Sequence, residues 1–111
     1  MAYDEDVAAR IRSLVAGEAG VAERRMFGGL AFLIGGNMAV AASGQGGLLV
    51  RVDPDAGAAL AREDGVAPME MRGREMRGWL RVDAARVADE DALARWVRTG
   101  VAFARSLPAK G

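Results

Sequence analysis

The chain has 111 residues, of which 51% are hydrophobic, and its fifteen basic and fifteen acidic residues give a formal net charge of zero at pH 7. This length and composition predict one compact domain over residues 1–111 with a hydrophobic core. The absence of cysteine and histidine excludes disulfides, thiolate chemistry and the commonest metal ligand, and it removes the usual general base near neutral pH.

The charge and hydropathy patterns also bear on partners and location. Nucleic-acid-binding domains are usually basic on one face, whereas the charges here are balanced and interspersed, so we do not expect this domain alone to bind nucleic acid. No apolar run approaches the roughly 20 residues that span a bilayer, and the acidic start at Met1–Asp6 does not match a secretory signal. We therefore expect a cytoplasmic protein with no membrane partner, metal or cofactor.

The N-terminal segment predicts an amphipathic helix over about Asp4–Ala16. Its acidic first turn suits the positive end of the helix dipole, and Gly17 is a candidate C-cap. Its apolar side chains fall on one face at helical spacing: Val7, Ile11, Leu14 and Val15.

Four short strands are predicted after this helix: about Glu23–Phe27, Leu30–Gly35, Asn37–Ala42 and Gly47–Val52. Short connections that contain glycine are typical of hairpins, so neighbouring strands should be antiparallel. A second short helix should start at Asp53-Pro54, because Asp is a strong N-cap and Pro suits the first helical position. We expect it to end by Gly65–Pro68 and to pack through three residues: Ala56, Ala59 and Leu60.

A second hairpin is predicted from Met69–Met71 and Met76–Val82, joined by a turn at Arg72–Glu75. Strand alternation would place Met76, Leu80 and Val82 on one face. The same alternation would place Arg77, Trp79 and Arg81 on the other face.

The clearest element is a final helix over about Asp89–Leu107, with three acidic residues at its start and Pro108 after its end. Gly100 lies within its apolar stripe, so we expect this helix to approach a neighbouring element closely there. The stripe has the three-and-four spacing of a helix face: Leu93, Trp96, Val97, Gly100, Phe103, Ala104 and Leu107.

With its elements in this order, the chain resembles the TfoX/Sxy N-terminal domain family from about Val7 to Pro108. The resemblance rests on six segments: Arg25-Met26-Phe27-Gly28-Gly29-Leu30-Ala31-Phe32, Gly36-Asn37-Met38, Leu49-Val50-Arg51-Val52, Pro68-Met69, Gly78-Trp79 and Ala102-Phe103-Ala104-Arg105-Ser106-Leu107-Pro108. It implies an α+β domain in which terminal helices pack on an antiparallel sheet of about five to six short strands, similar to the secretion-chaperone-like fold. The founding members look like regulators of competence for DNA uptake and carry a second, C-terminal domain. We expect a stand-alone N-terminal domain here, so their role is not transferred, and the resemblance implies no catalytic residues.

Two motifs allow either a ligand-binding or a structural interpretation. Gly28-Gly29 could hold an anion on its backbone N–H groups, but a strand follows it where a phosphate loop needs a helix, which favours a structural turn. Trp79 between Arg77 and Arg81 could stack on a base. In a neutral chain we favour packing beneath a helix or in an interface.

The methionines and two glutamates also allow either a functional or a structural interpretation. Five methionines could line an adaptable groove, although their alternating pattern favours ordinary core packing: Met26, Met38, Met69, Met71 and Met76. Glu70 and Glu75 flank the predicted turn, so we interpret them as solvated surface charges and not as an acid/base pair.

The absence of a candidate catalytic group predicts a non-enzymatic role, and the TfoX/Sxy resemblance implies a regulatory or protein–protein interaction domain. Its short strands with few charged edge residues would bind a protein, or a second copy as a homodimer, through an exposed sheet face or edge. A small-molecule-binding domain, which needs a closed pocket, and a nucleic-acid-associated adaptor remain alternatives. The adaptor requires one basic face containing Arg72, Arg74, Arg77 and Arg81. The candidate interaction surface is Arg25, Met26, Phe27, Gly28, Gly29, Met69, Met76, Arg77, Trp79 and Arg81.

Overall fold

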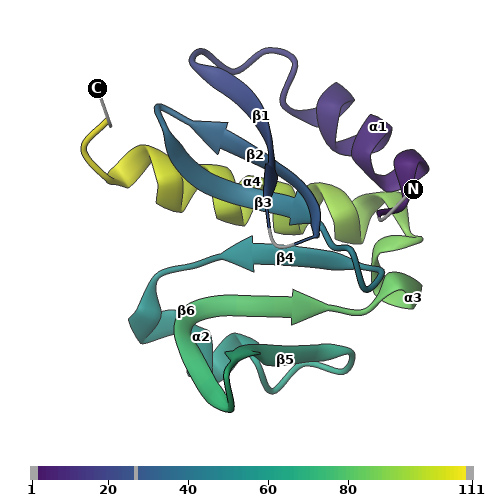
Figure 1. The fold of residues 1–111 in the computed structure, drawn as a ribbon, viewed down its shortest axis with the longest axis vertical. Coiled ribbons are helices and arrows are strands. Elements are labelled where there is room, and N and C mark those ends of the chain that lie inside the picture. Colours follow the sequence, from purple (N-terminus) through teal and green to yellow (C-terminus); the bar gives the residue numbers. More distant parts are fainter. Residues whose placement is uncertain (1–2, 27, 110–111) are drawn as a thin grey trace.

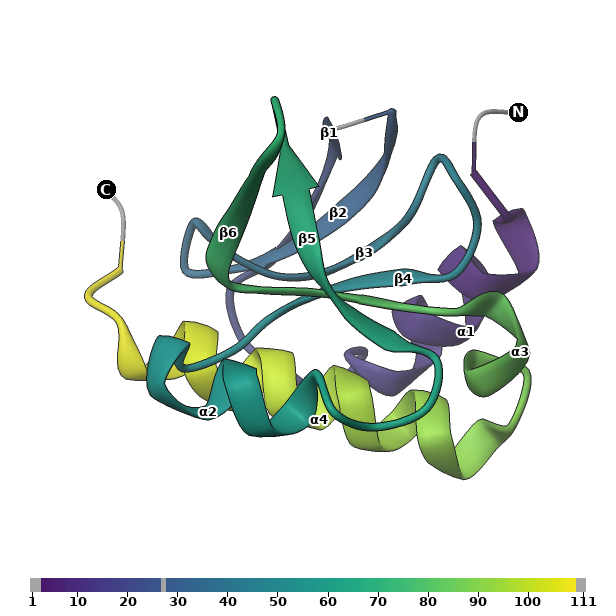
Figure 2. The ribbon, with the colours of Figure 1, turned by 90° about the horizontal axis from the view of Figure 1, so that it is seen from below.

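The computed structural model describes residues 3–26 and 28–109 as one antiparallel sheet with the helices gathered on one side of it (Figure 1, Figure 2). Its elements in chain order are α1 (Glu5–Leu14), β1 (Val21–Met26), β2 (Gly29–Ile34), β3 (Asn37–Ala42), β4 (Leu48–Arg51), α2 (Pro54–Leu60), β5 (Val66–Met71), β6 (Arg74–Val82), α3 (Ala84–Val87) and α4 (Glu90–Ser106). The strand order is β1-β2-β3-β4-β6-β5, and all neighbours are antiparallel. The predicted α+β class is confirmed.

Aspartate side chains cap the starts of three helices, as the sequence indicates. The Asp4 carboxylate accepts the backbone N–H of Asp6 at 2.9 Å at the start of α1. Asp53 and Asp89 cap α2 and α4 in the same way, each with an N···O distance of 2.9 Å. Each cap satisfies a backbone donor that the first turn of a helix leaves without a partner. The one-turn helix α3 was not predicted from the sequence.

The main core lies between the sheet and the helices α1 and α4. Its largest fully buried side chains are Trp96, Phe32, Ile11, Leu48 and Leu93. Gly100 faces β3, where a methyl group in place of its hydrogen would overlap the carbonyl oxygen of Ala39 and lie 2.8 Å from Cγ1 of Val40. The predicted close approach of the last helix is therefore confirmed, and the neighbour is a strand.

Three of the predicted packing faces are wrong in detail. In α1, Leu14 is 44% exposed and Ala8 takes its place in the core. In α2, Ala56 and Ala59 are exposed and Gly57 is the buried residue. In α4, Phe103 is half-buried, and Val101 fills the core. In α1 and α4 the buried stripe is rotated from the predicted one, because the angle at which a helix meets the sheet selects among adjacent candidate faces.

The predicted faces of the last strand are also wrong, because β6 contains a wide bulge. Pro68 pairs with Leu80 but Glu70 pairs with Glu75, so residues 76–79 stand opposite Met69 alone. Gly78, with φ of +84°, supplies a left-handed backbone conformation within this bulge. The alternation therefore changes between Met76 and Leu80, and these two side chains lie in different apolar clusters.

Candidate interaction face

The sheet has a second apolar cluster on the face that points away from the helices. We call it the methionine face. It is defined by the buried residues Ala31, Leu33, Met38, Ala41, Leu49 and Met69 and by four half-buried residues around them, Met26, Met71, Met76 and Trp79. In Figure 2 the helices lie below the sheet, and the β1–β2 and β5–β6 hairpins rise on the opposite side. Among the described residues no helix covers this face, which the two hairpins flank.

Strand alternation explains why methionines gather here. Met69 and Met71 are two residues apart in β5, so both point to the same side of the sheet. Met26 and Met38 come from β1 and β3, and Met76 comes from the bulge of β6. All five of the described methionines therefore lie on one face, although they are spread over four strands.

The methionine face has a buried floor and a partly accessible border. Met38 and Met69 are 4% and 7% exposed, so they pack as core residues. Met26, Met71, Met76 and Trp79 are each half-buried. The curved sheet covers much of its own apolar surface, and Leu14 on the helical side is the one large apolar side chain classed as exposed among the described residues. The predicted core packing is therefore confirmed for Met38 and Met69, whereas the adaptable groove stays a hypothesis for the half-buried methionines.

Two arginines contact the side chains of this face. The guanidinium carbon of Arg51 lies 5.2 Å from the centre of the Trp79 ring and 5.5 Å from that of Phe103 in α4, within the range of cation–π attraction. Arg81 donates a hydrogen bond to the side-chain oxygen of Gln45. Arg81 also lines a cavity of about 70 Å³ together with Leu49 and Met69.

The predicted surface residues fall into three groups. Met26, Met69, Met76 and Trp79 lie together on the methionine face, and Arg81 lies beside them in the small cavity. Two arginines lie elsewhere: Arg25 is paired with Leu30 and points to the helical side, and Arg77 forms an ion pair with Asp55 at 2.9 Å. Gly28 lies in the β1–β2 turn and Gly29 begins β2, where a methyl group on Gly29 would overlap the Ala42 carbonyl oxygen, so a structural turn is confirmed. Phe27 lies outside the described residues.

Other residues of the face were missed by sequence reasoning. Leu33 and Leu49 belong to the cluster, and Arg24 and Arg74 share the face as cross-strand partners of Ala31 and Met71. Alternation within a single strand could have grouped Leu49 with Arg51. The assignment of Arg24 to the same side requires the register between strands.

The two sheet edges are protected, which corrects the expectation of few charged edge residues. β1 forms one edge and exposes three consecutive charged side chains, Glu23, Arg24 and Arg25. β5 forms the other edge and contains Pro68, which has no N–H to donate. Charged residues and proline oppose the addition of another strand, so the face is a better docking candidate than either edge.

A depression of about 290 Å³ lies between α2 and β6 and does not have the features of a closed pocket. Its lining includes Pro54, Gly57, Pro68 and Trp79. Its two charged side chains, Glu75 and Arg77, are both exposed, whereas small-molecule sites converge polar groups in an enclosed apolar space. In residues 3–26 and 28–109 no group of three or more Asp or Glu side chains is arranged to hold a metal ion.

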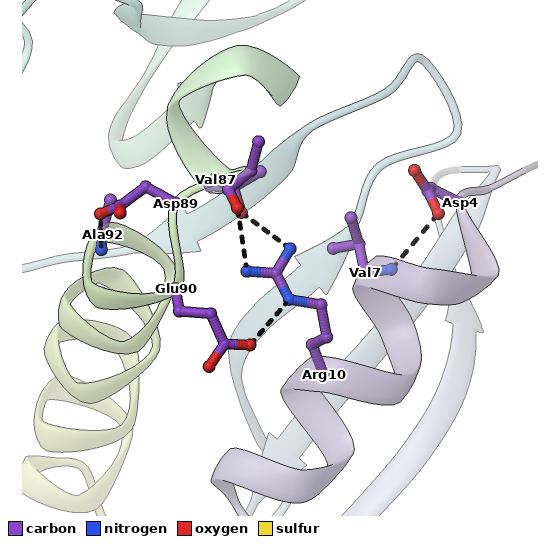
Figure 3. Close-up of polar contacts among 8 residues, drawn as sticks. Asp4, Val7, Arg10, Val87, Asp89, Glu90 and Ala92 are labelled. Atoms are coloured by element: carbon purple, nitrogen blue, oxygen red, sulfur yellow. Dashed lines mark hydrogen bonds and ion pairs between the residues drawn. The ribbon is translucent and has the colours of Figure 1, made fainter.

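The helical side carries ion pairs that hold its elements together. Arg10 of α1 donates to the carbonyl oxygen of Val87 at 3.0 Å and lies 3.4 Å from the carboxylate of Glu90 (Figure 3). Hydrogen bonds from Arg12 lower the pKa of Glu23, and hydrogen bonds from Arg95 lower the pKa of Glu63. These residues are therefore explained by structure and do not indicate a second site.

Comparisons with known proteins give one match. A family model described as the TfoX N-terminal domain matches residues 13–104. A search of curated proteins and a search of solved structures each gave no match. In the described part of the chain, no helix is long and apolar enough to cross a membrane.

Proposed function

The chain belongs to the TfoX N-terminal domain family, and on that premise we propose that it is a non-enzymatic domain that binds another protein through the methionine face. One observation carries the proposal. In the described part of the chain, a sheet face that no helix covers gathers five methionines and Trp79 from β1, β3, β5 and β6. Soluble domains normally cover both faces of an apolar sheet or keep one face polar, so an apolar face of this kind suits an intermolecular contact.

The chemistry of the half-buried residues supports protein recognition. Methionine side chains are flexible and polarizable, so they adapt to partners of different shape. Tryptophan is enriched among the residues that contribute most to interface energy. Met26, Met71, Met76 and Trp79 can reach a partner from the border of the face while Met38 and Met69 stay in the floor.

The proposed role is regulatory and cytoplasmic, in keeping with the competence regulators to which the family resemblance points. The protein would act by binding its partner, and we assign no chemical reaction to it. Its chain has no histidine or cysteine to act as base or nucleophile. A second copy of the chain is the alternative partner, which light scattering at micromolar concentration would detect.

A pull-down from the native host tests the proposal with matched variants. In the test variant, Met26→Gln and Met71→Gln replace two half-buried side chains by polar ones of similar length. In the control, Leu14→Gln makes the same kind of change on the exposed helical side. We expect a partner that is captured by the wild type and by the control but is depleted from the test variant, as measured by quantitative mass spectrometry. Equal capture by all three proteins would contradict the proposal, provided that circular dichroism shows all three to be folded.

A further inference from the structure

Of the fourteen described arginines, six form ion pairs with carboxylates and eight do not, and four of these eight lie in strands with their side chains at the methionine face. Six arginines of the helical side and of the α2–β6 contact form ion pairs with Asp or Glu: Arg10, Arg12, Arg77, Arg86, Arg95 and Arg105. Four arginines on the methionine face have no described carboxylate oxygen within 4.0 Å: Arg24, Arg51, Arg74 and Arg81. The neutral net charge of the chain therefore conceals an uneven distribution of charge.

Strand register places these four arginines at the methionine face. Directly opposed residues of antiparallel strands share a face, and Arg24 and Arg74 oppose Ala31 and Met71 of the methionine face. Arg81 opposes Leu49 in the same way. Arg51 opposes Trp79 at the end of β4, but its guanidinium also contacts the Phe103 ring of α4, so it does not belong to the methionine face alone. The strand residues that this register places on the face include no Asp or Glu.

The acids nearest in the strands do not neutralise the face. Glu75 is the cross-strand partner of Glu70. It directly follows Arg74 in β6, so its side chain points to the opposite side of the hairpin from that of Arg74. Glu70 also lines the small cavity beside Arg81, but its carboxylate is more than 4.0 Å from the Arg81 guanidinium. Arg24 and Arg74 are exposed. A partner would therefore find cations beside an apolar floor.

We infer that the partner segment bound by the methionine face is acidic, with Asp or Glu side chains flanking apolar anchors. The inference rests on the proposed function and adds the chemistry of the partner. The apolar anchors would pack against Met71, Met76 and Trp79, and the carboxylates would pair with Arg24, Arg74 and Arg81. Arginine forms bidentate hydrogen bonds with carboxylates, and opposite charges across an interface increase both association rate and specificity.

A random-peptide display library, selected on the full chain, provides the probe. We expect the enriched peptides to have a net negative charge and at least one large apolar residue. Binding of a synthetic enriched peptide should shift the indole N–H signal of the half-buried Trp79 in NMR spectra and leave that of the buried Trp96 unchanged. Its affinity should fall as the salt concentration rises, because exposed charge pairs are screened.

A pair of charge-reversal variants isolates the arginines of the face. Arg24→Glu with Arg74→Glu should weaken binding about tenfold or more, since like charges would then meet across the interface. Arg62→Glu with Arg98→Glu is the control, because it alters net charge equally at two exposed arginines that lie in no described ion pair. The control should change the affinity by about twofold or less, as exposed charges away from an interface do.

The possible outcomes separate this inference from the function on which it rests. Neutral or basic peptides that still shift the Trp79 signal would overturn the acidic partner and leave protein binding in place. Equal losses in the two charge-reversal variants would also overturn it. The absence of enriched peptides, or peptides that do not move the Trp79 signal, would overturn both proposals. A single-stranded oligothymidine that displaces the peptide at physiological salt would replace the acidic protein segment by a nucleic acid.

Discussion

Gly100 of α4 lies directly over the carbonyl group of Ala39 in β3, with no room for a methyl group between them. Ala39 is the extra residue at the irregularity between β2 and β3, where the pairing passes from Phe32–Val40 to Leu33–Met38. Ala39 and Val40 consequently both belong to the helix-facing core. The contact fixes how closely α4 packs, because neither backbone can move away without disturbing the sheet.

Replacement of Gly100 by leucine should therefore destabilise the domain. Overpacking in a core costs about 1–3 kcal/mol, and the higher helix propensity of leucine recovers less than about 1 kcal/mol. Ala102→Leu is the control, because Ala102 is exposed on the same helix. Urea unfolding measures both free energies, and a stable Gly100→Leu variant would show that α4 can shift away from β3.

Trp96 should tolerate phenylalanine much better than alanine. Its side chain is fully buried, and its indole N–H has no hydrogen-bond acceptor among the described residues. Trp96→Ala should cost about 3–5 kcal/mol through the cavity that it leaves. Trp96→Phe removes the unsatisfied donor together with part of the volume, so it should cost about 2 kcal/mol or less. Equal losses in urea unfolding would mean that the N–H is satisfied, for instance by a buried water.

The stability of the β6 bulge should depend on Gly78 both through its positive φ and through its close contact with a neighbouring carbonyl group. Gly73 and Gly78 both have positive φ, of +78° and +84°. A methyl group on Gly78 would lie 3.0 Å from the carbonyl oxygen of Val52, whereas one on Gly73 would meet no atom within 4 Å. Each alanine variant should lose about 1–2 kcal/mol from backbone strain, and Gly78→Ala should lose more. Chemical denaturation would contradict this if the two variants lost equal stability.

The ion pair between Glu63 and Arg95 should contribute to stability only above mildly acidic pH. Hydrogen bonds from Arg95, with N···O distances of 2.7 and 2.5 Å, lower the pKa of Glu63 in the folded state. The contribution is therefore present above the unfolded-state pKa of about 4.3 and is lost as the pH falls through the lower folded-state pKa.

The Glu63→Gln variant tests this contribution. The difference in the free energy of unfolding between wild type and Glu63→Gln should be largest near neutral pH and should shrink in acid. Glu70→Gln, an exposed residue in no described ion pair, is the control. A difference in the free energy of unfolding that does not vary with pH would show that it does not come from the charged Glu63–Arg95 pair.

Duplex DNA should not bind this domain specifically. The Arg72, Arg74, Arg77 and Arg81 face required for an adaptor does not form, because Arg77 pairs with Asp55 while Arg81 belongs to the other side of the sheet. Phosphate binding releases counterions and weakens steeply with salt, so fluorescence anisotropy should be measured over a range of salt concentrations. Submicromolar binding near physiological salt, lost on Arg74→Ala with Arg81→Ala, would contradict this prediction.

Local sequence determined where most helices and strands begin and end, and where the chain turns between them. Aspartates at positions 4, 53 and 89 provide caps that need only the next few residues, and β3 occupies the predicted Asn37–Ala42. The antiparallel order of the first four strands also follows from their short glycine connections. These features depend on backbone conformation within a few residues of one another, which a pattern of glycines and polar residues specifies directly.

The tertiary structure alone decided which residues from different helices and strands lie in contact. It placed β6 between β4 and β5, exposed Leu14 and brought Met26 of one edge strand into the same cluster as Met71 of the other. It also separated Met76 from Leu80, because the number of residues in a bulge depends on the partner strand. The unpaired arginines of the methionine face became visible only with the register between strands. Alternation tells which residues share a side of one strand, but the curvature and long-range packing of the sheet decide what each side faces.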